Sequence, residues 1–141
     1  MLFAVLFFEE KAEQTIRQIW EMLIKEDIAI NGIDHDVSPH MTLGMFKERY
    51  SYNRQQIESF ARRYAPLPIN MSNYGLFTSP HQVLFLGITV TDALYQLHRG
   101  FYQQFAHDLD TSTLFAPATY IPHCTLASDL KPQKLPTASA I

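Results

Sequence analysis

The stretch "SPHMTLG", residues 38–44, is nearly repeated later in the chain as "IPHCTLA", residues 121–127. Both contain Pro-His-x-Thr-Leu, and a second copy by chance is improbable for this composition in a chain of 141 residues. An internal repeat is therefore the first interpretation. A proline fits the start of a strand and favours an extended residue before it. The sequence thus predicts two equivalent short strands.

The histidine and the threonine of each copy are two positions apart. Side chains at that spacing share one face of a strand, while the residues between them point to the other face. We therefore expect His40 to project beside Thr42. In the second copy, His123 projects beside Thr125. Each strand then offers an imidazole and a hydroxyl on the same side.

Two histidines that face one phosphorus suit the cleavage of a phosphodiester. One neutral imidazole takes a proton from the attacking water, and one imidazolium protonates the departing oxygen; an ordinary pKa of about 6.5 makes both forms available. Threonine hydroxyls can hold the non-bridging oxygens. The sequence thus predicts catalytic His40 and His123 and phosphate-binding Thr42 and Thr125, with no metal ion and no cofactor.

The bulk composition fits one globular domain, with 47% hydrophobic residues and a formal net charge of -3. This charge is far from the basic footprint of proteins that hold long duplex nucleic acid. One phosphate needs few donors, so a nucleotide or a short RNA end is the expected partner. The apolar run Met1–Phe8 lacks a basic flank and is too short for a membrane. With a single cysteine, Cys124, we expect a cytoplasmic protein.

Strands and helices are expected to alternate, which indicates an α+β fold with helices packed outside mixed sheets. The equal spacing of elements around each repeat suggests two similar lobes. Loops are expected at 30–39 and in the tail 131–141. The expected elements are a strand over 1–8 buried on both faces, an amphipathic helix within 9–27, a strand at 39–47, a helix capped by Asn53 and ended by Pro66, strands at 69–78 and 82–90, a helix capped by Thr91 or Asp92, and a strand pair at 113–117 and 119–128.

Several side chains near the motifs have two interpretations. Strict alternation puts Phe46 on the face of His40, where it either stacks on a base or packs in the core. Phe77 or Tyr74 could do the same from a neighbouring strand, less favourably than Phe46. The small residues Gly44 and Ala127 follow the two threonines on the same expected face and leave room for a ligand.

A metal site is the weaker alternative. His35 and His40 can be drawn as zinc ligands with Asp34 and Asp36, but they lack a recognised metal-ligand spacing. Cys124 is expected to face the core as a small hydrophobic residue. The remaining histidines have structural or solvent-exposed interpretations: His98 in the core, His81 in a hairpin turn and His107 near a helix end.

The paired motifs "PHMTL" and "PHCTLA" resemble those of the 2H phosphoesterase superfamily, often called 2′-5′ RNA ligase-like proteins. The stretch "FTSPHQVLFLGITVTDALYQLHRGFYQQF" is similar to the hairpin, strand and central helix of that family. The resemblance covers residues 1–130 or so. It implies a bilobal, pseudo-symmetric fold in which one His-x-Thr strand per lobe lines a central groove.

The resemblance also implies an activity. Members hydrolyse 2′,3′-cyclic phosphates or 2′-5′ phosphodiester bonds in nucleotides or short RNA without a metal ion, and some reversibly ligate RNA ends. By that analogy His40 is the proton donor and His123 the acceptor. Family members usually continue past the second motif with a helix and a strand, so the single domain 1–141 is expected to lack them.

Two other classes of function stay open. A non-catalytic module would use the same His-x-Thr groove to bind a nucleotide without turnover. A structural or interaction domain would have no affinity for phosphate, and changing either threonine would have no effect on it.

Overall fold

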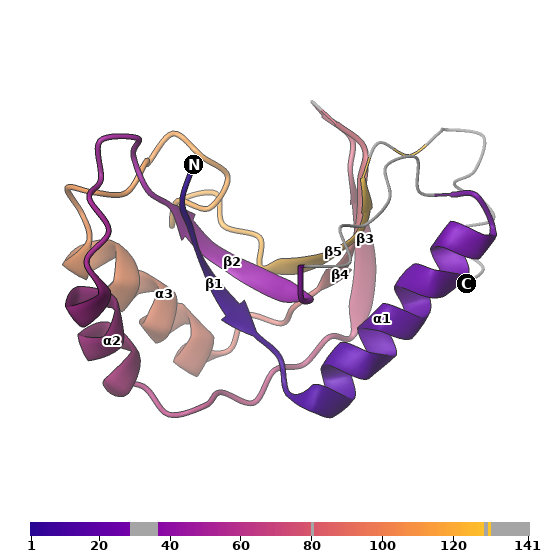
Figure 1. Ribbon diagram of the computed structural model, residues 1–141, viewed down its shortest axis with the longest axis horizontal. Coiled ribbons are helices and arrows are strands. Elements are labelled where there is room, and N and C mark those ends of the chain that lie inside the picture. Colours follow the sequence, from indigo (N-terminus) through magenta and orange to yellow (C-terminus); the bar gives the residue numbers. More distant parts are fainter. Residues whose placement is uncertain (29–36, 80, 129, 131–141) are drawn as a thin grey trace.

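The computed structural model describes residues 1–28, 37–79, 81–128 and 130. These residues form an α+β fold of three helices and two antiparallel sheets (Figure 1). The elements are β1 (Phe3–Phe7), α1 (Glu10–Lys25), β2 (His40–Met45), α2 (Arg54–Arg62), β3 (Asn73–Phe77), β4 (Val83–Gly87), α3 (Asp92–Gln104) and β5 (His123–Ser128). The expected loop 30–39 falls mostly, and the tail 131–141 wholly, outside the described residues.

The two sheets differ from the expectation of mixed sheets. β1 pairs with β2, and the second sheet has the order β3-β4-β5; every pairing among the described strands is antiparallel. The reason lies in α1, which follows β1 but packs against β5 of the other sheet (Figure 1). Parallel neighbouring strands would need α1 to cross over the β1–β2 sheet itself. Because α1 packs on the other sheet, β1 and β2 pair antiparallel.

The first hydrophobic core lies between the β1–β2 sheet and helices α2 and α3 (Figure 1). The amide N–H of Gln56 donates to the side chain of Asn53 at 3.2 Å, and that of Leu94 donates to Thr91 Oγ1 at 3.2 Å. Asn53 is thus confirmed as an N-cap, and of the two candidates for α3 it is Thr91, not Asp92, that caps the helix. The buried side chains of this core include Met41, Leu43, Phe46, Phe60, Leu97, Phe101 and Phe105.

The second core lies between α1 and the β3-β4-β5 sheet (Figure 1). The helix has Glu10 and Glu13 in its first turn and Lys25 in its last, as its dipole favours. Its apolar stripe packs on the sheet face opposite to His123. The buried residues are Ile16, Trp20, Leu23, Ile28, Leu84, Cys124, Leu126, Ala127 and Leu130.

Strand β1 is not buried on both faces, contrary to the prediction. Ala4 and Leu6 pack against the first core, whereas Phe3 is 42% exposed and Phe7 is 66% exposed. A continuous apolar run is typical of a two-sided buried strand. Here the face of β1 that carries Phe3 and Phe7 is apolar, but no helix of the described residues covers it.

The predicted strand at 113–117 is absent, and turns occupy this segment. The carboxylate of Asp110 accepts hydrogen bonds from the Ser112 amide at 2.9 Å and from its hydroxyl at 2.6 Å. Such side-chain bonds compete with a strand ladder for the backbone donors. Only the second half of the expected strand pair forms, as β5. Within the described residues, every helix is too short or too polar to cross a bilayer.

Candidate active site

Strands β2 and β5 contain the two copies of the repeat, and their backbones have the same irregularity. Val5 pairs with Thr42 and Ala4 with Gly44, so Leu43 is an extra residue. A β-bulge of this kind places two residues opposite one and changes the local twist.

The second copy repeats this register. Phe85 pairs with Thr125 and Leu84 with Ala127, so Leu126 is the extra residue. In both strands the bulge falls on the leucine that follows the motif threonine. The internal repeat therefore extends from the sequence to the backbone.

Both motif histidines are half-buried and are held by the same local hydrogen bond. His40 Nδ1 lies 2.9 Å from the carbonyl oxygen of Ser38, and His123 Nδ1 lies 2.7 Å from that of Ile121. A carbonyl oxygen only accepts, so each Nδ1 carries the hydrogen and donates it. In the neutral ring, Nε2 is then the basic atom, and it is the one left for proton transfer.

The two histidines lie close enough for the charge of His40 to affect the protonation of His123. Burial lowers the pKa of His123, the carbonyl of Ile121 partly opposes this, and the charge of His40 lowers it further. β2 and β5 are in contact, and the thiol of Cys124 lies against the backbone of His40. Burial raises the pKa of this thiol to about 11, so Cys124 is a buried neutral side chain, as predicted.

Aromatic rings surround His123. Its ring centroid lies 4.9 Å from that of Phe77, 5.3 Å from Phe85 and 6.5 Å from Phe115. Phe77 was a sequence candidate, whereas the other two were missed. Phe85 could have been found, because it lies two positions from Gly87, the cross-strand partner of His123. Phe115 lies in the turn segment, where no periodicity points to it.

The two motif threonines differ in exposure: Thr42 is half-buried and Thr125 is exposed. Within the described part of the chain, neither hydroxyl has a hydrogen-bond partner. Both hydroxyls can therefore donate to an incoming oxygen atom without breaking an existing bond.

Phe46 takes the second of its two interpretations, in the core. It is 3% exposed and stacks on Tyr50 with ring centroids 4.1 Å apart. The bulge at Leu43 is the physical reason, because one extra residue reverses the alternation that follows it. Phe46 is therefore not available for stacking on a base.

The bulges at Leu43 and Leu126 also contradict the expectation that Gly44 and Ala127 leave room for a ligand. A Cβ on Gly44 would lie 3.1 Å from the ring of Phe101, and Ala127 is 1% exposed in the second core. Both residues face the cores and leave no room for a ligand. Tyr74 pairs with Leu86, which packs toward α1, so its ring also lies on the face opposite to His123.

The other histidines occupy the environments that the sequence predicts. His98 is buried at 3% exposure, whereas His81 and His107 are exposed. Of the drawn zinc ligands, His35, Asp34 and Asp36 lie outside the described residues. Among the described residues, no three potential metal ligands gather in one place.

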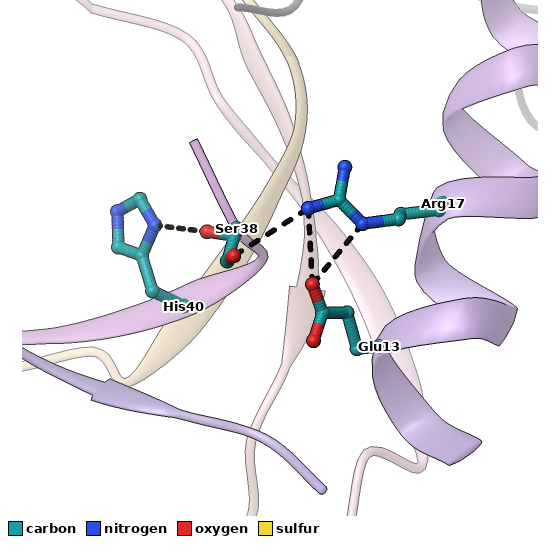
Figure 2. A network of polar contacts seen from close by, with 4 residues as sticks. All are labelled: Glu13, Arg17, Ser38 and His40. Atoms are coloured by element: carbon teal, nitrogen blue, oxygen red, sulfur yellow. Dashed lines mark hydrogen bonds and ion pairs between the residues drawn. The ribbon is translucent and has the colours of Figure 1, made fainter. Parts of the chain in front are cut away.

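A contact from α1 to the first motif was missed at the sequence level (Figure 2). Arg17 donates to the hydroxyl of Ser38 at 3.4 Å and forms an ion pair with Glu13 at 3.0 Å. The carbonyl of the same serine accepts the Nδ1–H of His40. The helix thereby fixes the residue that orients the first imidazole.

Comparison with known proteins identifies the family of the chain. A family model described as the 2′-5′ RNA ligase superfamily matches residues 50–141. The chain belongs to this superfamily. The matched region contains His123 and Thr125 of the second motif but begins after His40. The first motif lies outside the match, and its repeated sequence connects it with the second motif. No curated protein and no solved structure matches the chain. Membership of this superfamily supports a phosphoesterase-like or ligase-like enzyme.

Proposed function

We propose that the protein is a metal-independent phosphodiesterase that hydrolyses 2′,3′-cyclic phosphate or 2′-5′ phosphodiester bonds in nucleotides or short RNA. The observation that carries this proposal is the identical register and Nδ1 anchoring of His40 and His123 on two strands in contact. Two imidazoles with free Nε2 atoms supply the acid and the base of one displacement.

In this proposal His123 is the general base and His40 the general acid. The lowered pKa of His123 keeps its ring neutral, and a positive charge on His40 lowers the pKa of His123 further. His123 Nε2 removes a proton from water, and the resulting hydroxide attacks phosphorus. His40 Nε2–H donates its proton to the departing ribose oxygen as the P–O bond breaks. The roles exchange for ligation, the reverse reaction.

The substrate phosphate would lie in a central groove between two lobes, each contributing one motif strand. The unpartnered hydroxyls of Thr42 and Thr125 would donate to its non-bridging oxygens, where negative charge increases. Phe77, half-buried beside His123, is the proposed stacking surface for a base. A nucleotide or a short RNA end is the proposed partner, in the cytoplasm.

The test is a panel of 2′,3′-cyclic nucleotides and 2′-5′ linked dinucleotides incubated with the protein in the presence of EDTA. We expect hydrolysis by the wild type that EDTA does not diminish. His40→Ala and His123→Ala should each lose about 100-fold or more. The matched control is His107→Ala, at an exposed position, which should retain the wild-type rate.

The runner-up function is a nucleotide-binding module that uses the same residues without turnover. Tight binding of a nucleotide without cleavage of any substrate in the panel would favour it and overturn the proposed hydrolysis. If the protein neither binds nor cleaves these compounds, both functions are rejected.

A further inference from the structure

The carbonyl oxygens of the two motif threonines have equivalent side-chain donors. The hydroxyl of Tyr120 donates to the carbonyl of Thr42 at 2.8 Å. The indole Nε1–H of Trp20 donates to the carbonyl of Thr125 at 3.2 Å. The acceptor is the same position of the repeat in both cases, directly before the bulge.

The sheet topology explains why these carbonyls need donors. β2 and β5 each form the last strand of their sheet, so each has one edge without a pairing strand among the described strands. An edge strand presents backbone donors and acceptors that must find other partners when they are buried. At Thr42 and Thr125 those partners are aromatic side chains rather than a neighbouring strand.

Each donor comes from the opposite half of the chain. Trp20 lies on α1, before the first motif, and binds the second motif strand. Tyr120 lies just before the second motif and binds the first motif strand. The two bonds therefore tie the motif strands to each other's half of the molecule.

Both donors are themselves fixed. The ring of Tyr120 stacks on His98 at 3.7 Å with an interplanar angle of 3°. His98 Nε2–H donates to the carbonyls of Leu43, the bulged residue, at 3.1 Å and of Phe115 at 2.9 Å. Trp20 is 8% exposed in the core under α1.

We propose that Trp20 and Tyr120 are positioning residues, which hold the two His-x-Thr strands at the separation that lets His40 and His123 act on one phosphate. Neither residue touches the substrate. The expected effect on catalysis rests on the proposed function. The effect on the relative position of the two imidazoles does not. Small displacements of reacting groups are costly, because productive geometry is narrow.

The test uses Tyr120→Phe and Trp20→Phe, which remove the donor atom and keep an aromatic ring. Tyr95→Phe, at a residue 47% exposed on α3, is the matched control. The first readout is the NMR titration of the imidazole C–H protons of His40 and His123, which needs no activity. If the strands separate, the charge of His40 acts less on His123, and the pKa of His123 rises in both variants relative to the wild type and the control.

The second readout is steady-state kinetics on a substrate that the wild type cleaves. We expect kcat to fall about 10-fold with KM changed less than about 2-fold, because the contacts to substrate stay intact. Unchanged titration and unchanged kcat in the two variants would overturn the inference. If Trp20→Phe does not fold, Tyr120→Phe decides. If the wild type cleaves nothing, the proposed function fails and the titration still decides the positioning.

Discussion

At the residue scale, the state of each ring nitrogen determines what the two motif histidines can do. The repeated "PH" signal was enough to select His40 and His123 from the sequence. The hydrogen bonds from Nδ1 to the Ser38 and Ile121 carbonyls could not be predicted, because they depend on the backbone conformation of the two residues before each histidine. They leave Nε2 of both rings for chemistry.

The dependence of kcat/KM on pH should be bell-shaped. The rate falls at acidic pH as the base His123 is protonated, and at alkaline pH as the acid His40 loses its proton. Because burial and the charge of His40 hold the pKa of His123 below its ordinary value of 6.5, the acidic limb should lie below pH 6.5. In His123→Ala the residual activity should lack this limb. A persistent acidic limb in that variant would assign the base to another group.

His98 should make stability depend on pH. Burial lowers the pKa of His98, its hydrogen bonds to the carbonyls of Phe115 and Leu43 partly oppose this, and the charge of Arg99 lowers the pKa further. The unfolded chain then binds more protons than the folded one, so the free energy of unfolding decreases as pH falls below about 6.5. Urea unfolding of wild type and His98→Gln over about pH 5 to 8 measures this. The variant should be less stable at neutral pH with a shallower decline, and equal slopes would contradict the account.

At the element scale, hydrophobic periodicity predicted the helices and the central strands, and Asn53 and Thr91 were found as caps by their residue type. The bulges in β2 and β5 were not predictable, because a period-2 pattern contains no signal for one extra residue. For this reason Phe46 takes its core interpretation, and the expectation that Gly44 leaves room for a ligand failed.

Gly44→Ala tests the geometry of the bulge. Its Cβ would lie 3.1 Å from Phe101, 3.2 Å from Leu109 and 3.2 Å from the hydroxyl of Tyr102. Crowding in this core should reduce the free energy of unfolding by about 1–3 kcal/mol. Denaturant unfolding measures the loss, with exposed Ser59→Ala as the control. A Gly44→Ala variant as stable as the wild type would mean that this residue faces open space.

The cap of α2 offers a second test at this scale. Asn53→Ala removes the acceptor of the Gln56 amide and should cost about 1 kcal/mol of stability. Asn53→Asp keeps an acceptor oxygen and should retain most of the wild-type stability. Equal losses in both variants, measured by urea unfolding, would show that the cap is not the cause.

At the scale of the whole molecule, contacts between distant halves of the chain bring the motif strands together. α1 follows β1 but packs on the second sheet (Figure 1). The hydroxyl of Tyr120 donates to the carbonyl of Thr42 in β2. Local sequence patterns do not encode such long-range pairings, so the antiparallel sheets and the roles of Trp20 and Phe115 could not be predicted. The repeat alone indicated that the two motifs belong together.

Combining Trp20→Phe with Tyr120→Phe tests whether the two hydrogen bonds fix the same quantity, the separation of β2 and β5. If each fixes the same separation of β2 and β5, the loss in kcat of the double variant should be smaller than the product of the single losses. Kinetics of the three variants on one substrate measure this coupling. Losses that multiply would mean that the two residues act independently.

The central claim, that His40 and His123 share one phosphate, is tested most directly by NMR of the protein with 15N-labelled histidine. A nucleoside 2′-phosphate, one of the two products that hydrolysis of a 2′,3′-cyclic phosphate can give, is added in increments. We predict that the Nε2 resonances of both motif histidines shift together with one saturation curve, while those of exposed His107 do not. A shift of only one motif histidine, or of neither, would contradict it.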